Sequence, residues 1–156
     1  MAPTLEKIQN LSELVTNKVY VSDVLDASNK DYEGKWVING DALITIDLNE
    51  AKLEKVDETT KTAIIILPHP KVTSPRVDYT RTKPAYIKGV RFALLRNPKN
   101  KEKMQQDMMA VAQKSIEKSA GRDEIMENAR TQAALIISNL YLKVGWKLII
   151  EWQGEE

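Results

Sequence analysis

The chain of 156 residues contains no cysteine and a single histidine. The absence of cysteine excludes disulfides, thiol catalysis and cysteine-ligated zinc or iron–sulfur sites. One histidine cannot build a multi-histidine metal site, so we expect neither a metal nor a cofactor. The longest apolar runs, residues 63–67 and 133–137, are five residues each, whereas a membrane-spanning helix needs about 20. We therefore expect no membrane-spanning helix in this sequence, and its first residues lack the features of a signal peptide.

Motifs for phosphate binding and acyl transfer are also missing. The six glycines stand apart, and the Gly34-Lys35 pair is followed by Trp36, where a phosphate-binding loop requires Ser or Thr. No Gly-x-Ser-x-Gly motif occurs. These absences favour a non-enzymatic domain. One alternative is a hydrolase organised around His69, which lies between two prolines after a predicted strand. The other interpretation of His69 is a strand-ending turn with its imidazole in solvent.

Composition and the spacing of apolar residues indicate one α+β domain. The chain is 42% hydrophobic and 29% charged, which is typical of soluble globular proteins. Residues 1–17 are predicted to form an N-terminal amphipathic helix, or a remnant that follows a membrane anchor. Residues 18–153 are predicted to form a single domain. Its order of strands, two helices and a strand predicts a mainly antiparallel sheet with a C-terminal helical hairpin packed on one face and a final short strand.

Short strands are predicted in the first half of that domain. Alternating apolar side chains indicate strands near residues 19–25, 35–38 and 42–48. Asn39-Gly40 separates the last two, and this pair favours a tight hairpin turn. Residues 63–67 are apolar and rich in β-branched side chains, which predicts a central strand covered on both faces.

Two helices and a strand are predicted in the C-terminal part. Asn97-Pro98 suits an N-cap followed by the first helical position. Gly121 is expected to end this helix in a left-handed conformation. A second helix is predicted from Asp123 onward and stops at Gly145, and alternation over residues 146–152 predicts the final strand.

Charge is unevenly distributed along the chain. Residues 69–103 hold ten basic side chains against two acidic ones, a net charge of +8, while the whole chain is at +1 and the remainder therefore at −7. Tyr79, Tyr86 and Phe92 lie among these charges. We predict that the basic side chains form one anion-binding surface made of Lys71, Arg76, Arg81, Lys83, Lys88, Arg91, Arg96, Lys99, Lys101 and Lys103.

Two classes of partner fit a surface of this sign. It would attract the phosphates of anionic lipids or those of nucleic acid, on whose bases the interleaved aromatic rings could stack. The opposing interpretation is that these charges are scattered over several faces and are neutralised by the acidic remainder of the chain.

Several segments together resemble a bacterial domain family of unknown function. They are the strand ending in Ile46-Asp47-Leu48, the turn at Val56-Asp57, the strand exit Leu67-Pro68-His69-Pro70 and the helical Glu127-Asn128-Ala129-Arg130. The resemblance covers residues 11–153. It implies a single N-terminal membrane anchor ahead of the domain and a location at a membrane face outside the cytoplasm, whereas a member without the anchor would be cytoplasmic. It implies no activity, substrate or catalytic residue.

The residues and the resemblance lead to one hypothesis and two alternatives. The hypothesis is an uncharacterised, non-enzymatic, membrane-tethered envelope domain whose basic surface contacts anionic lipid, another envelope protein or a second copy of the chain. The alternatives are a nucleic-acid-binding module that uses the same basic segment, and a hydrolase organised around His69.

Overall fold

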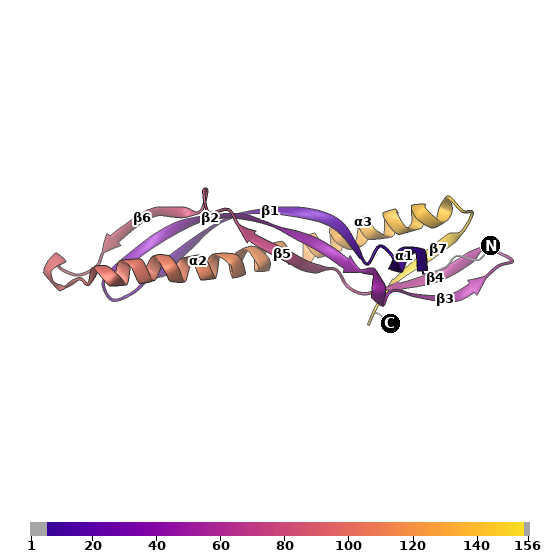
Figure 1. Ribbon diagram of the computed structural model, residues 1–156, viewed down its shortest axis with the longest axis horizontal. Helices are drawn as coiled ribbons and strands as arrows, with labels where there is room; N and C mark the ends of the chain where they lie inside the picture. Colours follow the sequence, from indigo (N-terminus) through magenta and orange to yellow (C-terminus); the bar gives the residue numbers. More distant parts are fainter. Residues whose placement is uncertain (1–5, 155–156) are drawn as a thin grey trace. The chain divides into compact units, whose positions relative to one another are not determined.

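The computed structural model describes residues 6–154, and the chain divides into two compact units. Unit 1 contains the residues up to Asn17, residues 43–71 and the residues from Arg122 onward. Unit 2 contains residues 18–42 and 72–121. Two long strands, β1 (Glu13–Ser28) and β2 (Tyr32–Asp47), contribute residues to both units (Figure 1). Residues 1–5 of the predicted N-terminal segment lie outside the described residues.

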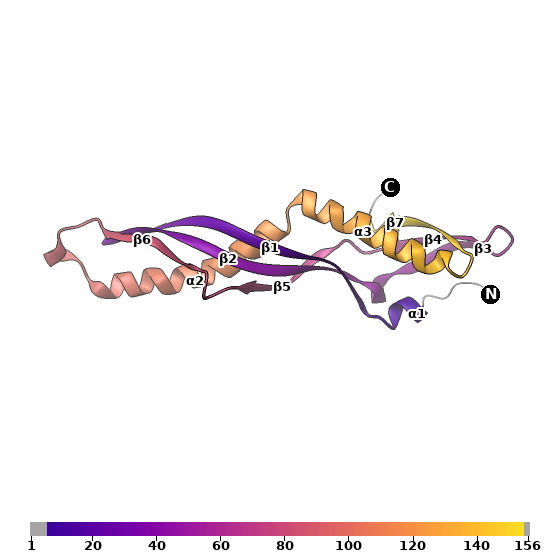
Figure 2. The same ribbon diagram turned by 90° about the horizontal axis from the view of Figure 1, so that it is seen from above.

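Unit 1 is built on a three-stranded sheet of order β3-β4-β7. β3 and β4 pair antiparallel, whereas β4 and β7 pair parallel, with Ile65 opposite Ile150. Figures 1 and 2 show α3 running alongside this sheet. Its elements are α1 (Glu6–Gln9), η1 (Leu48–Glu50), β3 (Lys52–Asp57), β4 (Thr62–Leu67), α3 (Asp123–Leu142) and β7 (Lys147–Trp152).

The core of unit 1 lies between this sheet and α3. Ala63, Ile65 and Leu67 of β4 are buried, while Ile64 and Ile66 are half-buried. Because β4 lies between β3 and β7, its predicted central position is confirmed. One of its faces is covered more fully than the other. From α3 the buried side chains are Ala129, Ala133, Ile137 and Tyr141.

Unit 2 combines parts of β1 and β2 with two further strands and a long helix. The sheet has the order β1-β2-β5, and β6 pairs with β2 antiparallel, with Glu33 opposite Lys88. One face of α2 is buried through Met104, Met108, Ala112, Ile116 and Ala120. The elements are β5 (Lys71–Val77), β6 (Lys83–Gly89), η2 (Ala93–Leu95) and α2 (Pro98–Ala120).

The hairpin turn predicted at Asn39-Gly40 was wrong, because β2 continues through both residues. Thr82 Oγ1 accepts a hydrogen bond from the backbone N–H of Asn39 at 2.9 Å, and the side-chain amide of Asn39 donates to the carbonyl of Arg81 at 2.8 Å. A Cβ on Gly40 would lie 2.2 Å from the carbonyl oxygen of Arg76 and 2.2 Å from Cδ1 of Ile116. The absence of a side chain at Gly40 thus lets β5 and α2 approach β2 closely. Close approach of a neighbouring backbone is a common reason for a glycine within a strand.

Two helix ends also differ from the sequence prediction. The N-terminal helix is the four-residue α1, and β1 begins at Glu13. From Leu14 onward, exposed and less exposed side chains alternate as in a strand, with one break at Thr16 and Asn17. Gly121 caps α2 with φ −89°, outside the left-handed region, while Gly145 beyond α3 does have a positive φ of 84°. The predicted N-cap is confirmed, since Asn97 Oδ1 accepts from the N–H of Lys99 at 3.1 Å and Pro98 is the first helical residue.

The predicted α+β class is confirmed, with two C-terminal helices and a final short strand. The β4–β7 pair is parallel and so departs from the predicted antiparallel arrangement. α2 packs within unit 2, and α3 packs within unit 1. Among the described helices, none has the length and apolar character that crossing a membrane requires.

Candidate functional site

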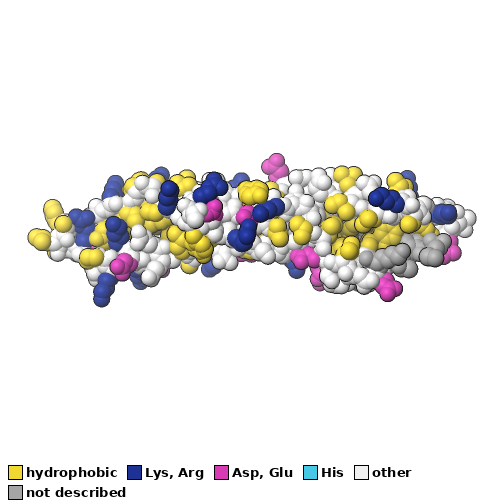
Figure 3. All heavy atoms as spheres, turned by 45° about the horizontal axis from the view of Figure 1, so that its top comes forward, with side chains coloured by type: hydrophobic (Ala, Val, Ile, Leu, Met, Phe, Trp, Pro, Cys, Tyr) yellow, Lys and Arg dark blue, Asp and Glu magenta, His cyan; other side chains and the backbone are white. Residues whose placement is uncertain are grey.

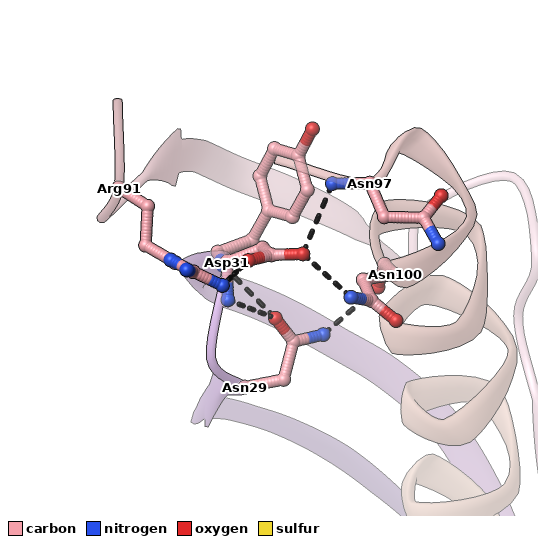
Figure 4. Close-up of polar contacts among 6 residues, drawn as sticks. Asn29, Asp31, Arg91, Asn97 and Asn100 are labelled. Atoms are coloured by element: carbon pink, nitrogen blue, oxygen red, sulfur yellow. Dashed lines mark hydrogen bonds and ion pairs between the residues drawn. The ribbon is translucent and has the colours of Figure 1, made fainter. Parts of the chain in front are cut away.

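A fully buried carboxylate organises one end of unit 2. Asp31 lies in the turn between β1 and β2, and its side chain is 1% exposed. Its carboxylate accepts hydrogen bonds from the backbone N–H of Asn97 at 3.0 Å and from Nδ2 of Asn100 at 2.6 Å, and it forms an ion pair with Nη1 of Arg91 at 3.2 Å (Figure 4). These partners come from the start of α2 and from the segment before it, so one side chain joins the β1–β2 turn to both.

Asn29 also stabilises the β1–β2 turn. Its Oδ1 accepts from the backbone N–H groups of Asp31 and Tyr32 at 3.0 and 2.9 Å, and its Nδ2 donates to the carbonyl of Asn100 at 2.9 Å (Figure 4). Asn and Asp commonly stabilise turns in this way. Because the bonds of Asn29 link the turn to itself and to Asn100 of α2, they help to fix the position of the helix start.

Hydrogen bonding keeps Asp31 ionised. The backbone N–H of Asn97 contributes most to lowering the pKa of Asp31 below its usual value, the side chains of Asn100 and Arg91 add to the effect, and burial opposes it. A buried carboxylate with several donors and a cation is stable as the anion. The negative charge of Asp31 is therefore stabilised by groups of the protein itself.

This network holds both ends of residues 90–96, which we call the tip loop. At the start of the tip loop, the N–H of Val90 donates to the carbonyl of Asp31 at 2.9 Å. Just past its end, the N–H of Asn97 donates to the Asp31 carboxylate. Within the loop, the single turn of η2 is closed by a bond from the N–H of Leu95 to the carbonyl of Phe92 at 2.8 Å. Hydrogen bonds to Asp31 thus hold the tip loop at both ends.

The tip loop presents large apolar side chains to solvent. Leu94 is 99% exposed, Phe92 is 83% exposed and Leu95 is 57% exposed. Figure 3 shows hydrophobic side chains at the end of unit 2 where α2 begins, with Lys and Arg side chains beside them on the same face. Isolated exposed leucines are ordinary, but three large apolar side chains within four residues form a patch.

Five cations lie in the tip loop itself, at the start of α2 and in the β1–β2 turn. Lys99, Lys101 and Lys103 are exposed at the start of α2, whose first turn has no acidic residue. The guanidinium of Arg96 lies against Gly89, where a Cβ would be 2.0 Å from Nη1. Exposed Lys30 is next to Asp31 in the β1–β2 turn. None of these five has an ion pair with a described residue, and we call them the tip cations.

The ten basic residues predicted from the sequence are divided by the fold. Lys71 belongs to unit 1 and the other nine to unit 2. Three are paired with acids: Arg76 with Asp41 through two bonds of 2.9 and 2.8 Å, Lys88 with Glu33 at 2.7 Å, and Arg91 with Asp31. Arg81 lies in the β5–β6 turn and Lys83 starts β6. The remaining four are tip cations, namely Arg96, Lys99, Lys101 and Lys103.

Sequence reasoning missed Lys30 and the two acids that matter most here. Asp31 and Glu33 lie far before the basic segment in the chain, and only the β2–β6 pairing brings them to it. The apolar run of Phe92, Leu94 and Leu95 was visible in the sequence, but its spacing does not separate a buried strand from an exposed loop.

A groove of about 560 Å³ lies beside the tip cations, between the end of β1 and the start of α2. Met104 and Met108 form its apolar floor, and Lys30 and Lys103 lie along it together with Asp26 and Asp107. The residues that line the groove include Ser28 but no histidine.

His69 lies in unit 1, separate from these groups. It is exposed, its ring stacks on that of Trp152 with the centroids 6.4 Å apart, and its Nδ1 lies 3.3 Å from Nη2 of Arg130. Catalytic histidines are usually oriented by a carboxylate. In residues 6–154 this imidazole instead lies beside the guanidinium of Arg130, and no cluster of three or more potential metal ligands occurs there.

Most of the chain matches one known protein family. Residues 6–151 match the sequence model of the family described as protein of unknown function (DUF4230). The chain belongs to this family. The resemblance inferred from the sequence is therefore confirmed, although a membrane anchor is not shown. No curated protein and no solved structure gives a significant match.

Proposed function

We propose that this DUF4230 domain is a non-catalytic module that binds the phosphate headgroups of an anionic lipid surface through its tip cations. In this proposal the domain acts at a membrane face. The tip cations provide positive charge that the protein leaves unneutralised, and lipid phosphates are the anions that would neutralise it.

The position of three lysines at the start of α2 carries the proposal. The N-terminus of a helix bears a partial positive charge, so a cation in the first turn, such as Lys99, is unfavourable by about 0.3–1 kcal/mol. Lys99, Lys101 and Lys103 lie within the first two turns and have no ion pair with a described residue. A bound phosphate would neutralise the lysines and interact favourably with the helix end. Protein stability alone gives no reason to place lysines there.

The charges of the two units support the same proposal. Unit 2 contains 14 Lys and Arg against nine Asp and Glu, a formal charge of +5, and unit 1 contains nine against 13, a formal charge of −4. An anionic surface would therefore attract unit 2 and repel unit 1. Since each Lys or Arg close to an anionic membrane contributes about fivefold in affinity, a cluster of five free cations suffices for measurable binding.

Binding to lipid vesicles tests the proposal. The chain is expected to sediment with vesicles of phosphatidylglycerol and phosphatidylcholine and to bind them less as the salt concentration rises. It is not expected to bind vesicles of pure phosphatidylcholine. The double variant Lys99→Glu, Lys103→Glu is expected to bind at least tenfold more weakly. Its matched control is Lys114→Glu, Lys118→Glu, which makes the same charge change farther along the same helix and is expected to retain most of the binding.

Two results would contradict the proposal. One is equal loss of binding in the two double variants, which would mean that only net charge matters. The other is tight, salt-dependent binding of oligonucleotides together with no binding to anionic vesicles, which would favour the nucleic-acid alternative.

A further inference from the structure

The tip loop has a separate role from the tip cations. We infer that it inserts Phe92, Leu94 and Leu95 into the boundary between the headgroups and the acyl chains, so that the domain is held by a shallow apolar wedge as well as by charge. The inference rests on the proposed function and adds a mode of binding to it.

Exposure of these side chains has no explanation within the protein. Leu94 is 99% exposed and Phe92 is 83% exposed, so their apolar surface contributes almost nothing to the folded core. Transfer of such side chains from water into an apolar medium is favourable. Exposed apolar groups gathered in one place commonly mark a surface that binds another apolar phase.

The base of the tip loop is rigid, which favours insertion. Asp31 binds the backbone on both sides of the loop, through Val90 and Asn97, and η2 adds a turn between them. A segment that is already ordered loses little conformational entropy when it binds. The wedge is therefore presented in the conformation in which it enters the membrane.

The charges around the wedge fit an interface between water and lipid. Arg96 directly follows Leu95 in the chain and Lys99 lies three residues farther on, and both are basic side chains with long aliphatic stems. With the wedge among the upper acyl carbons, these cations would lie at the depth of the phosphates, the arrangement of peripheral proteins that enter by about 5–10 Å.

The size of the patch favours lipid over a second protein chain. Three side chains on one short loop expose roughly 500 Å² at most, which is below the roughly 600–800 Å² that each partner of a stable protein–protein interface buries. A lipid surface does not require an extended complementary surface, and its anionic headgroups complement the adjacent tip cations. A lipid bilayer is therefore the occupant to which the inference commits.

The absence of cysteine makes the depth of insertion directly measurable. A Leu94→Cys variant has one thiol, which can carry an environment-sensitive fluorophore. With vesicles of phosphatidylglycerol and phosphatidylcholine, the label is expected to shift to the blue and to be quenched by lipids that carry a quencher on the upper acyl chain. The control is Leu142→Cys on α3, another exposed leucine at 63%, whose label is expected to stay in water.

A second variant separates insertion from charge attraction. Phe92→Ser, Leu94→Ser and Leu95→Ser together keep all tip cations and remove only exposed side chains, so the fold is expected to persist. Each replacement is expected to weaken vesicle binding by about tenfold, and the binding that remains should disappear at high salt.

The outcomes distinguish this inference from the proposed function. If the triple serine variant binds as tightly as the unmodified chain, with the same salt dependence, and the label at position 94 stays in water, insertion is wrong while electrostatic binding stands. If the unmodified chain binds no anionic vesicle, both are wrong. A blue-shifted, quenched label together with weakened, fully salt-sensitive binding of the serine variant supports both.

Discussion

The backbone N–H of Asn97 donates a 3.0 Å hydrogen bond to the carboxylate of Asp31, a residue 66 positions earlier in the chain. That bond joins the turn between two strands to the cap of a long helix. It also closes the base of the tip loop, whose other end is held by the carbonyl of the same aspartate. The exposed apolar side chains and the free lysines therefore have a common structural support.

Replacing Asp31 by Asn is expected to loosen the tip loop and lower the thermal stability of the protein by several degrees. The amide keeps the size of the side chain but loses the charge, and its NH₂ group must face either Arg91 or the donors of Asn97 and Asn100, which leaves at least one donor without its acceptor. Hydrogen exchange at Val90 and Asn97 should become faster. Asp57→Asn is the control, since that carboxylate accepts from Thr59 and Thr60 in a turn of unit 1. Equal exchange at Asn97 in both variants would contradict the role given to Asp31.

The stabilising effect of Asp31 is expected to be lost in acid. Its pKa is lowered in the folded protein, first by the Asn97 N–H, so its contribution is complete above the unfolded value of 3.8 and disappears as pH falls through the lower folded value. Asp41, Asp57 and Asp78 also have lowered pKa values and act in the same direction. Thermal unfolding measured from pH 7 to pH 2.5 should show falling stability below about pH 4, with a smaller fall in Asp31→Asn. A fall of equal size would show that Asp31 is not linked to folding.

Gly40→Ala is expected to destabilise unit 2 by about 1–3 kcal/mol, as overpacked sites do. The new methyl group would meet a backbone carbonyl, that of Arg76, and the side chain of Ile116, both at 2.2 Å. Gly121→Ala is the matched control, because its φ is ordinary and the nearest atoms would be 3.4 Å away. Urea unfolding of both variants measures the difference. Equal stability of the two would mean that β2 and its neighbours can separate without cost.

Lys99→Glu is expected to stabilise the protein by about 1 kcal/mol while weakening lipid binding. The new carboxylate lies in the first turn of α2, where negative charge is favourable. Lys118→Glu makes the same change in the last turn of the helix and is expected to destabilise it, with little effect on binding. Chemical denaturation gives the stability and vesicle sedimentation gives the affinity. If stability and affinity decreased together in Lys99→Glu, the lysine would be a structural residue.

Some of this structure follows from the sequence and some does not, for identifiable physical reasons. The cap at Asn97-Pro98 and the strand at residues 63–67 depend on local chemistry and apolar pattern, and both are confirmed. The role of Gly40 depends on Arg76 and Ile116, which are distant in the chain, so its local preference for a turn was misleading. Tertiary context overrides local propensity in such cases.

The candidate site could likewise be predicted only in part from the sequence. The basic segment could be recognised by counting charges, and four of its lysines and arginines are tip cations. Which of the ten are free depends on the partners Asp31, Glu33 and Asp41, and these are set by the pairing of distant strands. Lys30 could not be assigned to the site before the β1–β2 turn was placed against the start of α2.

The most direct test of the account is the affinity of the unmodified chain for anionic vesicles at low and high salt, measured beside the Lys99→Glu, Lys103→Glu variant. We predict binding that rises with the phosphatidylglycerol fraction, weakens with salt and drops at least tenfold in the variant. Binding that is equal for the two proteins, or that does not depend on anionic lipid, would contradict the account.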